Sequence, residues 1–361
     1  MNSRMLQLDG LRGVAILLVF FYHAFYRWSD RIKFINEDFY DFFSIGYLGV
    51  NLFFMISGYV IFLTLDNSKS ALSFMLKRWL RLFPCMLICS IIIFASGIFF
   101  WERPSGMPMV SDLIPGFSFI SPELINFFTG YELKSLEGSF WSLYVEFTFY
   151  VICASVYFIL GRRFVLPIIF TIAVTSFFIL VLFKIIGVSS KLFYAFNSLG
   201  FKHYCWFFIG CIFYIKSERL LERSEKVMLC ICLIISLFFS KGDYYTLLGI
   251  ISILLLFASV LKFPFLIECL SSRLLVFFGF VSYPLYLLHE GLLVSIILKV
   301  ERLLVIPAFF MFVLPILILV FFSVIAYPIA KFIEPSIKKL LLNLIKKATK
   351  LNKVPKLRFR F

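Results

Sequence analysis

Long apolar segments constrain this chain more than any other feature of its sequence. Ten windows of about 20 residues are apolar enough to cross a hydrocarbon core roughly 30 Å thick as helices. Charged residues make up only 15% of the chain, against roughly 25% in a soluble globular domain. The sequence therefore predicts an all-α, polytopic integral membrane protein with about ten transmembrane helices. The predicted spans are 11–27, 46–65, 82–101, 139–160, 164–186, 203–215, 227–240, 245–261, 274–298 and 304–330.

The basic residues alternate between the segments that join these spans. If the N-terminus lies in the cytoplasm, 24 of the 35 Lys and Arg fall on the cytoplasmic side, as the positive-inside rule expects. We therefore expect both termini in the cytoplasm and the lipid bilayer around the spans. This topology accounts for the net charge of +15 without a nucleic-acid partner.

Domain organisation follows from the same pattern. We expect one membrane domain over residues 1–335 and a basic tail over 336–361. The tail is either an amphipathic helix on the anionic inner leaflet or a solvated basic stop. The longest outer segment, about 102–138, contains several prolines and acidic residues, and it is predicted to form an irregular cap.

The first span carries Arg12 near one end and His23 near the other. Eleven residues are close to three helical turns, so the two side chains share a face and lie roughly 16 Å apart along the axis. Ionisable groups in such segments usually face protein or water and are functional by default. The alternative is that Arg12 marks the cytoplasmic end of the span and His23 the far interface.

Two further clusters lie on the second and third spans. Ser57 and Gly58 fall near the middle of a span, where small residues also serve close helix packing. Arg78 and Arg81 are three residues apart on one helical face, and paired guanidinium groups suit phosphate recognition. Ordinary anchoring at the cytoplasmic boundary is the alternative for this arginine pair.

Polar groups also occur inside the fourth and ninth spans. Glu146 lies about two turns inside the outer boundary and shares a helical face with Ser142, and a carboxylate at that depth needs a partner or water. Tyr286 and His289 share a face of the ninth span, where they and Glu290 equally suit an interface role. The eight cysteines are scattered, and no metal site is expected.

Together these stretches resemble the membrane acyltransferase-3 family. Each motif alone is weak, but five in the same order along nearly the whole chain are specific. They are Arg12 followed by ten residues and His23, Phe53-Phe54-x-x-Ser57-Gly58, Arg78-x-x-Arg81-x-x-Pro84, Trp141-Ser-Leu-x-x-Glu146 and Ser282-Tyr-x-x-Tyr286-x-x-His289.

The resemblance implies ten spans in a bacterial inner membrane, with residues 1–335 as a membrane acyltransferase domain. It implies transfer of an acyl group, commonly acetyl, from acyl-CoA to a hydroxyl of a cell-surface or lipid-linked glycan such as O-antigen. Acetyl-CoA is then a co-substrate, and no bound cofactor is expected.

This chemistry assigns a role to each candidate residue. Arg12, Arg78 and Arg81 are expected to bind the donor. His23 is expected to act as general base or to accept the acyl group first, and Glu146 to orient His23 or collect the proton. The remaining candidates line the acceptor site or pocket: Ser57, Trp141, Ser142, Tyr286 and His289.

A transporter or flippase for a lipid-linked sugar or ion is the main alternative. Intramembrane His, Glu and Arg also serve proton relays. The Arg12 to His23 spacing favours the enzyme, and the lack of an internal repeat weakly disfavours the transporter.

Overall fold

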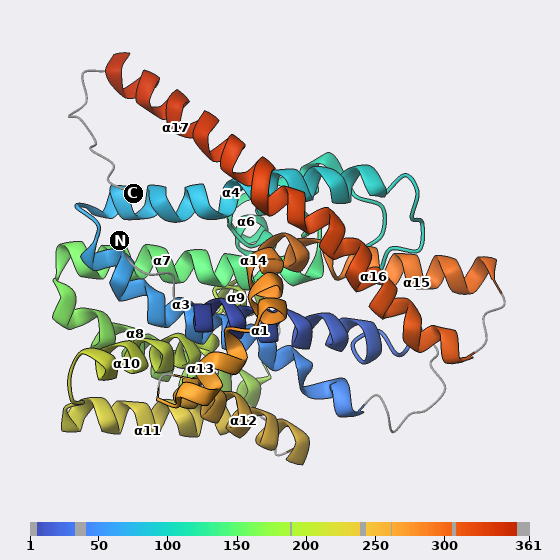
Figure 1. The fold of residues 1–361 in the computed structure, drawn as a ribbon. Coiled ribbons are helices and arrows are strands. Elements are labelled where there is room, and N and C mark those ends of the chain that lie inside the picture. The colour runs from blue at the N-terminus through green and yellow to red at the C-terminus, as the bar shows by residue number, and fades with distance from the viewer. Residues whose placement is uncertain are drawn as a thin grey trace.

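A computed structural model describes residues 6–32, 41–187, 190–238, 243–260, 262–304 and 308–351. Every regular element in these ranges is a helix (Figure 1). Predictions that fall on Arg4, on residues 239–240, 261 and 305–307, or on the tail beyond residue 351 lie outside the described residues. The longer helices are α1 Leu6–Phe25, α3 Leu48–Asp66, α4 Ala71–Ser96, α7 Trp141–Ile159, α8 Val165–Ile186, α10 Tyr204–Glu218, α11 Arg223–Phe238, α12 Tyr244–Val260, α14 Arg273–Leu288, α15 Gly291–Leu303, α16 Ala308–Pro328 and α17 Glu334–Leu351.

The all-α, polytopic prediction is confirmed. Six helices within the described residues are long and apolar enough to cross a membrane, and the number rises to eight if two bent helix pairs each form one span. The sixth and seventh predicted spans correspond to α10 and α11, which have 15 and 16 residues. Both are shorter than the roughly 20 residues that an untilted span needs.

The predicted ninth span is not one straight helix. Helix α14 ends at Leu288, α15 begins at Gly291, and the two are bent by 69°. The prediction of a continuous helix over 274–298 is therefore wrong. Hydropathy did not reveal the bend because apolar residues continue on both sides of it.

The last span continues far beyond its predicted end. Helix α16, the π-helical turn Ile329–Ile333 and α17 form one continuous helix that crosses the others obliquely (Figure 1). The expected boundary between residues 335 and 336 falls inside this helix. Within the described residues, the tail begins as a helix with exposed Leu340 and Leu344 among its lysines.

The segment predicted as an irregular cap contains only short helices. These are the single turns Val110–Asp112 and Gly138–Phe140, together with α5 Leu113–Ser118 and α6 Pro122–Thr129. Two more short helices lie elsewhere in the chain, α9 Lys191–Ser198 and α13 Pro264–Leu270, as do the single turns Ser44–Tyr47, Arg162–Phe164 and Phe201–His203.

Helix α1 packs between α3 and α14, and glycines permit its closest crossing. A Cβ on Gly13 would lie 2.1 Å from the Leu275 carbonyl oxygen, and one on Gly279 would lie 1.8 Å from the Asp9 carbonyl oxygen. The backbones of α1 and α14 are therefore in direct contact. Small residues allow this approach between membrane helices.

A second glycine crossing joins α3 to α10. A Cβ on Gly58 would lie 2.1 Å from the Phe207 carbonyl oxygen, and one on Gly210 would lie 2.0 Å from that of Met55. The expected packing role of the Ser57-Gly58 pair thus belongs to Gly58. Ser57 points its hydroxyl to α7 instead, where it donates to Glu146.

These crossings predict that Gly279→Ala destabilises the protein. The added methyl group forces α1 and α14 apart, and overpacking of this kind typically costs about 1–3 kcal/mol. Alanine is intrinsically the better helix former, so any loss reports the clash. Thermal unfolding in detergent measures it, with Gly116→Ala as the control because its nearest neighbour, Met86 Sδ, lies at 3.4 Å. Equal melting temperatures for the two variants would contradict the packing argument.

Candidate active site

Helix α1 carries Arg12 and His23 to two different cavities. A large cavity of about 1530 Å³, called here the His23 cavity, is lined by His23, Tyr286 and Glu290 at one side. A small cavity of about 80 Å³, called here the Arg81 cavity, is lined by Arg12, Arg81 and Tyr286. Because Tyr286 lines both, the cavities share a wall at this residue.

His23 lies beside the bend between α14 and α15. Its Nδ1 lies 3.5 Å from Oε1 of Glu290, and its ring centroid lies 4.7 Å from that of His289. His289 and Glu290 occupy the bend between α14 and α15, where the chain changes direction. The bend thus presents two titratable side chains to α1.

Several atoms of this cluster are buried and lack a hydrogen-bond partner among the described residues. They are His23 Nδ1, His289 Nε2 and Oε2 of Glu290. Buried polar groups are nearly always hydrogen-bonded, so an accumulation of exceptions marks a place where substrate or water completes the bonding.

The tautomer of His289 follows from its contacts. Its Nδ1 lies 2.6 Å from the Tyr286 carbonyl oxygen, which can only accept, so Nδ1 carries a proton. In the neutral ring Nε2 is then an acceptor. The Tyr286 hydroxyl in turn donates to the Ser139 carbonyl at 3.0 Å and shares a hydrogen bond of 2.7 Å with the Ser142 hydroxyl.

Glu146 lies in the Arg81 cavity with its own partners. Its Oε1 accepts from the Ser57 hydroxyl at 2.7 Å and from the Tyr150 hydroxyl. The expectation that Glu146 orients His23 therefore has no contact to support it. Glu290 is the carboxylate that lies beside His23.

The arginines predicted to act together lie in different surroundings. Arg81 lines the small cavity, whereas Arg78 is only 3% exposed and lines neither cavity. The Arg78 guanidinium donates to the Thr64 hydroxyl at 2.5 Å and lies 4.7 Å from the centroid of the Tyr150 ring. Arg78 therefore ties α4 to α3 and α7, which is closer to the anchoring alternative. Arg12 pairs with Asp9 at 2.9 Å and still reaches the small cavity.

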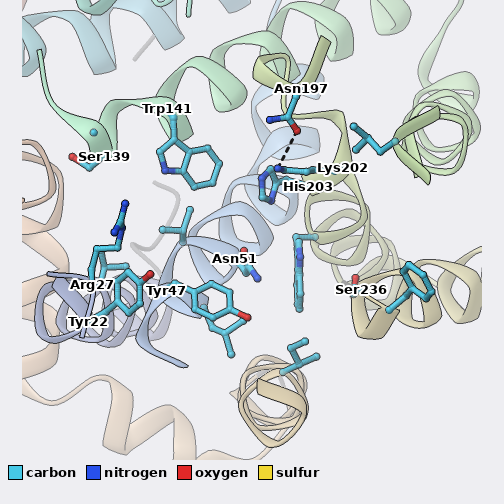
Figure 2. Close-up of a pocket in the computed structure, with 18 of the residues that line it drawn as sticks. Tyr22, Arg27, Tyr47, Asn51, Ser139, Trp141, Asn197, Lys202, His203 and Ser236 are labelled. Carbon is cyan, nitrogen blue, oxygen red and sulfur yellow. Dashed lines mark hydrogen bonds between the residues drawn. The ribbon is translucent and has the colours of Figure 1, made fainter. Parts of the chain in front are cut away.

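Aromatic and cationic residues line the rest of the His23 cavity (Figure 2). Trp141 is 40% exposed and lies over the ring of His203 at 4.9 Å between centroids. Arg27, Lys184 and Lys202 also line this cavity, and Glu290 is the one acidic side chain among the described residues of its lining. Burial lowers the pKa of the Lys202 ammonium, so an anionic partner there would be favoured.

The structure thus brings most of the predicted residues together. His23, Trp141 and Tyr286 line the large cavity, Arg12, Arg81 and Glu146 line the small one, and Ser57 and Ser142 lie in the wall of the small one. His289 lines neither cavity and contacts the His23 ring. Within the described part of the chain, no group of three or more His, Cys, Asp or Glu is arranged to hold a metal ion.

Sequence reasoning missed the role of three charged residues. The sequence leaves open whether Glu290 belongs to the polar cluster or to the interface, although a carboxyl group directly after His289 in an apolar stretch is a usable signal. Arg103 and Glu137 flank the proline-rich cap and form a buried ion pair of 3.0 Å. No local pattern distinguishes them from other charges of a loop.

Comparison with known proteins agrees with this architecture. The family model described as an acyltransferase domain, Acyl_transf_3, matches residues 5–331. No solved structure matches the chain.

Relatives at low identity carry acetyltransferase names. The chain is 25% identical over 324 residues to the O-acetyltransferase OatA of Staphylococcus aureus strain NCTC 8325, covering 80% of this chain and 50% of that protein. It is 24% identical over 326 residues to the putative peptidoglycan O-acetyltransferase YrhL of Bacillus subtilis strain 168, covering 80% and 48%. The peptidoglycan O-acetyltransferase OatA of Listeria monocytogenes is 27% identical over 157 residues, covering 40% and 23%.

The chain therefore spans about half of the length, or less, of these curated relatives. The family model, by contrast, covers nearly all of the chain, and the resemblance inferred from five motifs is confirmed. The chain belongs to the acyltransferase-3 family of membrane proteins.

Proposed function

We propose that this protein is a membrane-bound O-acyltransferase that moves an acyl group, acetyl in the simplest case, from acyl-CoA to a hydroxyl of a glycan. The observation that carries the proposal is the placement of His23. It faces the large cavity beside Glu290 and His289, and that cavity shares the Tyr286 wall with a small cavity that holds two arginines. A base, a wide acceptor site and a cationic donor site thus adjoin one another.

His23 has the surroundings of a general base. In the reaction the 3.5 Å gap between His23 Nδ1 and Glu290 Oε1 closes to a hydrogen bond, and Nε2 takes the proton of the acceptor hydroxyl. The hydroxyl oxygen then attacks the thioester carbonyl, the carbon–sulfur bond breaks, and CoA leaves as a thiolate that collects the proton. In a two-step variant His23 takes the acyl group first and passes it to the hydroxyl. Glu290 stabilises the positive imidazolium in either route.

The donor would approach through the Arg81 cavity. Its volume of about 80 Å³ accommodates a group of a few heavy atoms rather than a whole nucleotide, so it suits the acyl end of the donor. Arg12 and Arg81 supply positive charge there, and Ser57 and Glu146 supply hydrogen-bonding groups. Arg78 supports this site from behind, through Tyr150, rather than from within it.

The acceptor would occupy the His23 cavity. Its volume exceeds the roughly 300–1,000 Å³ of a typical small-molecule site, which suits an oligosaccharide. Arg27, Lys184 and Lys202 favour a glycan that carries phosphate or carboxylate groups. Lipid-linked or cell-surface glycans such as O-antigen meet this description, and the names of the relatives add peptidoglycan as a second candidate.

We further propose a location in the bacterial inner membrane with both termini in the cytoplasm, because the basic residues favour that side. Acyl-CoA then meets the protein on its cytoplasmic side and the glycan on its outer side. The rival function of a transporter or flippase loses support, since the family model describes an acyltransferase domain.

Topology provides the first test. Reporter fusions after Arg103 and after Phe361 should report opposite sides of the membrane, the latter the cytoplasm, because the basic residues set the orientation. Alkaline phosphatase and green fluorescent protein fusions measure this directly. Signals from the same side for both fusions would rule out the proposed orientation.

Loss of His23 should remove transfer. His23→Ala takes away the proposed base, and a lost general base costs about 10²–10⁴-fold. Mass analysis of O-antigen and of peptidoglycan from cells with and without the protein measures the added acetyl groups and identifies the acceptor. His289→Ala should be milder, since that residue contacts the His23 ring without lining either cavity. If the His23 variant keeps more than about a tenth of the activity at equal protein level, His23 is not the base.

The two arginines should separate in their effects. Arg81→Ala should raise the KM for acyl-CoA, because it removes a charge from the small cavity, and Arg81→Lys should recover part of the affinity. Arg78→Ala should mainly lower the melting temperature, because it removes the hydrogen bond to Thr64 on α3 and the contact with the Tyr150 ring on α7. Steady-state kinetics and thermal unfolding of the purified variants distinguish these outcomes. Equal effects of the two alanine variants on KM would assign both arginines to the donor.

A further inference from the structure

We propose that Glu137 and Arg103 are a positioning pair that holds the bend between α14 and α15, and through it holds Glu290 against His23. Neither residue lines the two cavities, so neither is placed to touch a substrate. The proposal rests on the proposed function in one respect only, because it assigns the consequence of the contact to the acyl transfer reaction.

The first step is the contact between Glu137 and the bend. Glu137 Oε2 accepts a hydrogen bond of 2.9 Å from the backbone N–H of Gly291, the first residue of α15. The first N–H groups of a helix have no partner within the helix, and a negative charge is favourable at that end. Glu137 therefore satisfies a donor that exists only because the helix is broken there.

The second step is the anchoring of Glu137. Its Oε1 accepts from the Arg103 guanidinium at 3.0 Å, and Arg103 also donates to the carbonyl oxygens of Leu136 at 2.8 Å and Ile93 at 3.2 Å. Glu137 is 0% exposed and Arg103 is 4% exposed. The pair thus connects the bend to α4, and it cannot exchange its partners for water.

The third step is the close fit at both sides of the bend. A Cβ on Gly291 would lie 2.4 Å from Oε2 of Glu137, and a Cβ on Gly138 would lie 2.8 Å from Oε2 of Glu290. Glycine at both positions lets each carboxylate approach the opposite backbone. Gly291 follows Glu290 and Gly138 follows Glu137, so these two short segments are locked together. This lock holds Glu290 at 3.5 Å from His23.

A double-mutant cycle tests the proposal. Glu137→Gln should lower kcat about 10–100-fold, the range for a misplaced reacting group, with the KM for acyl-CoA unchanged. If Glu137 acts through Glu290, the double variant with Glu290→Gln should be no slower than Glu290→Gln alone, within about threefold. Losses that multiply, or a rise in KM without a change in kcat, would overturn the positioning role.

A matched control separates this pair from ion pairs in general. Arg302 pairs with Glu102 at 3.0 Å at the opposite end of α15, where the Arg302 side chain is 67% exposed. Arg302→Gln should leave kcat within about twofold of the unmodified protein, because the exposed Arg302 guanidinium can exchange its partner for water. A loss equal to that of Glu137→Gln would overturn the specific role of the Glu137 and Arg103 pair, because removal of any ion pair that contacts α15 would then have the same effect.

A labelling experiment makes the proposal independent of catalysis. The variant Glu290→Cys is labelled with a water-soluble maleimide, and mass analysis of the labelled peptide measures the reaction rate of its thiol. This rate should be several-fold higher when Glu137→Gln is also present. The reason is that the released bend exposes the thiol more often. Equal rates would contradict the lock even in an active enzyme. If the unmodified protein transfers no acetyl group, the proposed function fails while this measurement still judges the role of Glu137.

Discussion

Direct backbone contact between α1 and α14 is the constraint on which the site depends. At the Gly13 and Gly279 crossing no side chain separates the two helices. The rest of α1 is therefore fixed relative to α14, and His23 meets the bend where α14 ends. A larger residue at the crossing would move His23 away from Glu290 before it disturbed either side chain directly.

The buried ionisable groups of the interior differ in how completely their hydrogen bonds are satisfied. An ionised group far from water is stable only with a partner. The structure supplies Asp9 for Arg12, Glu137 for Arg103, and hydroxyl groups for Glu146. Buried atoms without a hydrogen-bond partner remain on His23 and Glu290, which line the large cavity, and on Arg103 Nε, which lines neither cavity. Those at the cavity are placed to meet a substrate.

The sequence predicted what depends on local spacing. Helical periodicity placed Arg12 and His23 on one helix at two depths, and apolar windows located most of the spans. The same rule placed Arg78 and Arg81 on one face. It could not predict that Arg78 would bind Thr64 and contact the Tyr150 ring, whereas Arg81 would line a cavity. That outcome depends on which helices become neighbours, which spacing along one helix does not encode.

The bend and its charges were beyond local reasoning for a similar reason. Hydropathy averages the polarity of the residues and contains no information on the direction of the helix axis. The bend at His289 and Glu290 lies within an apolar stretch, so hydropathy could not predict it. The pairing of Glu137 with Gly291 joins segments far apart in the chain. This pairing could not be predicted without knowledge of which segments become neighbours in the fold. Short apolar stretches such as α10 and α11 likewise left the number of spans open.

The separation of the two cavities at Tyr286 bears on the ion gradient across the membrane. Val50 and Tyr286 line both cavities, and hydrogen bonds to Ser139 and Ser142 hold the Tyr286 hydroxyl in place. A charge that crosses a membrane releases about 2.3 kcal/mol for every 100 mV, so a continuous water path would dissipate the ion gradient. The Tyr286 side chain, fixed by these hydrogen bonds, keeps the two cavities from joining into such a path.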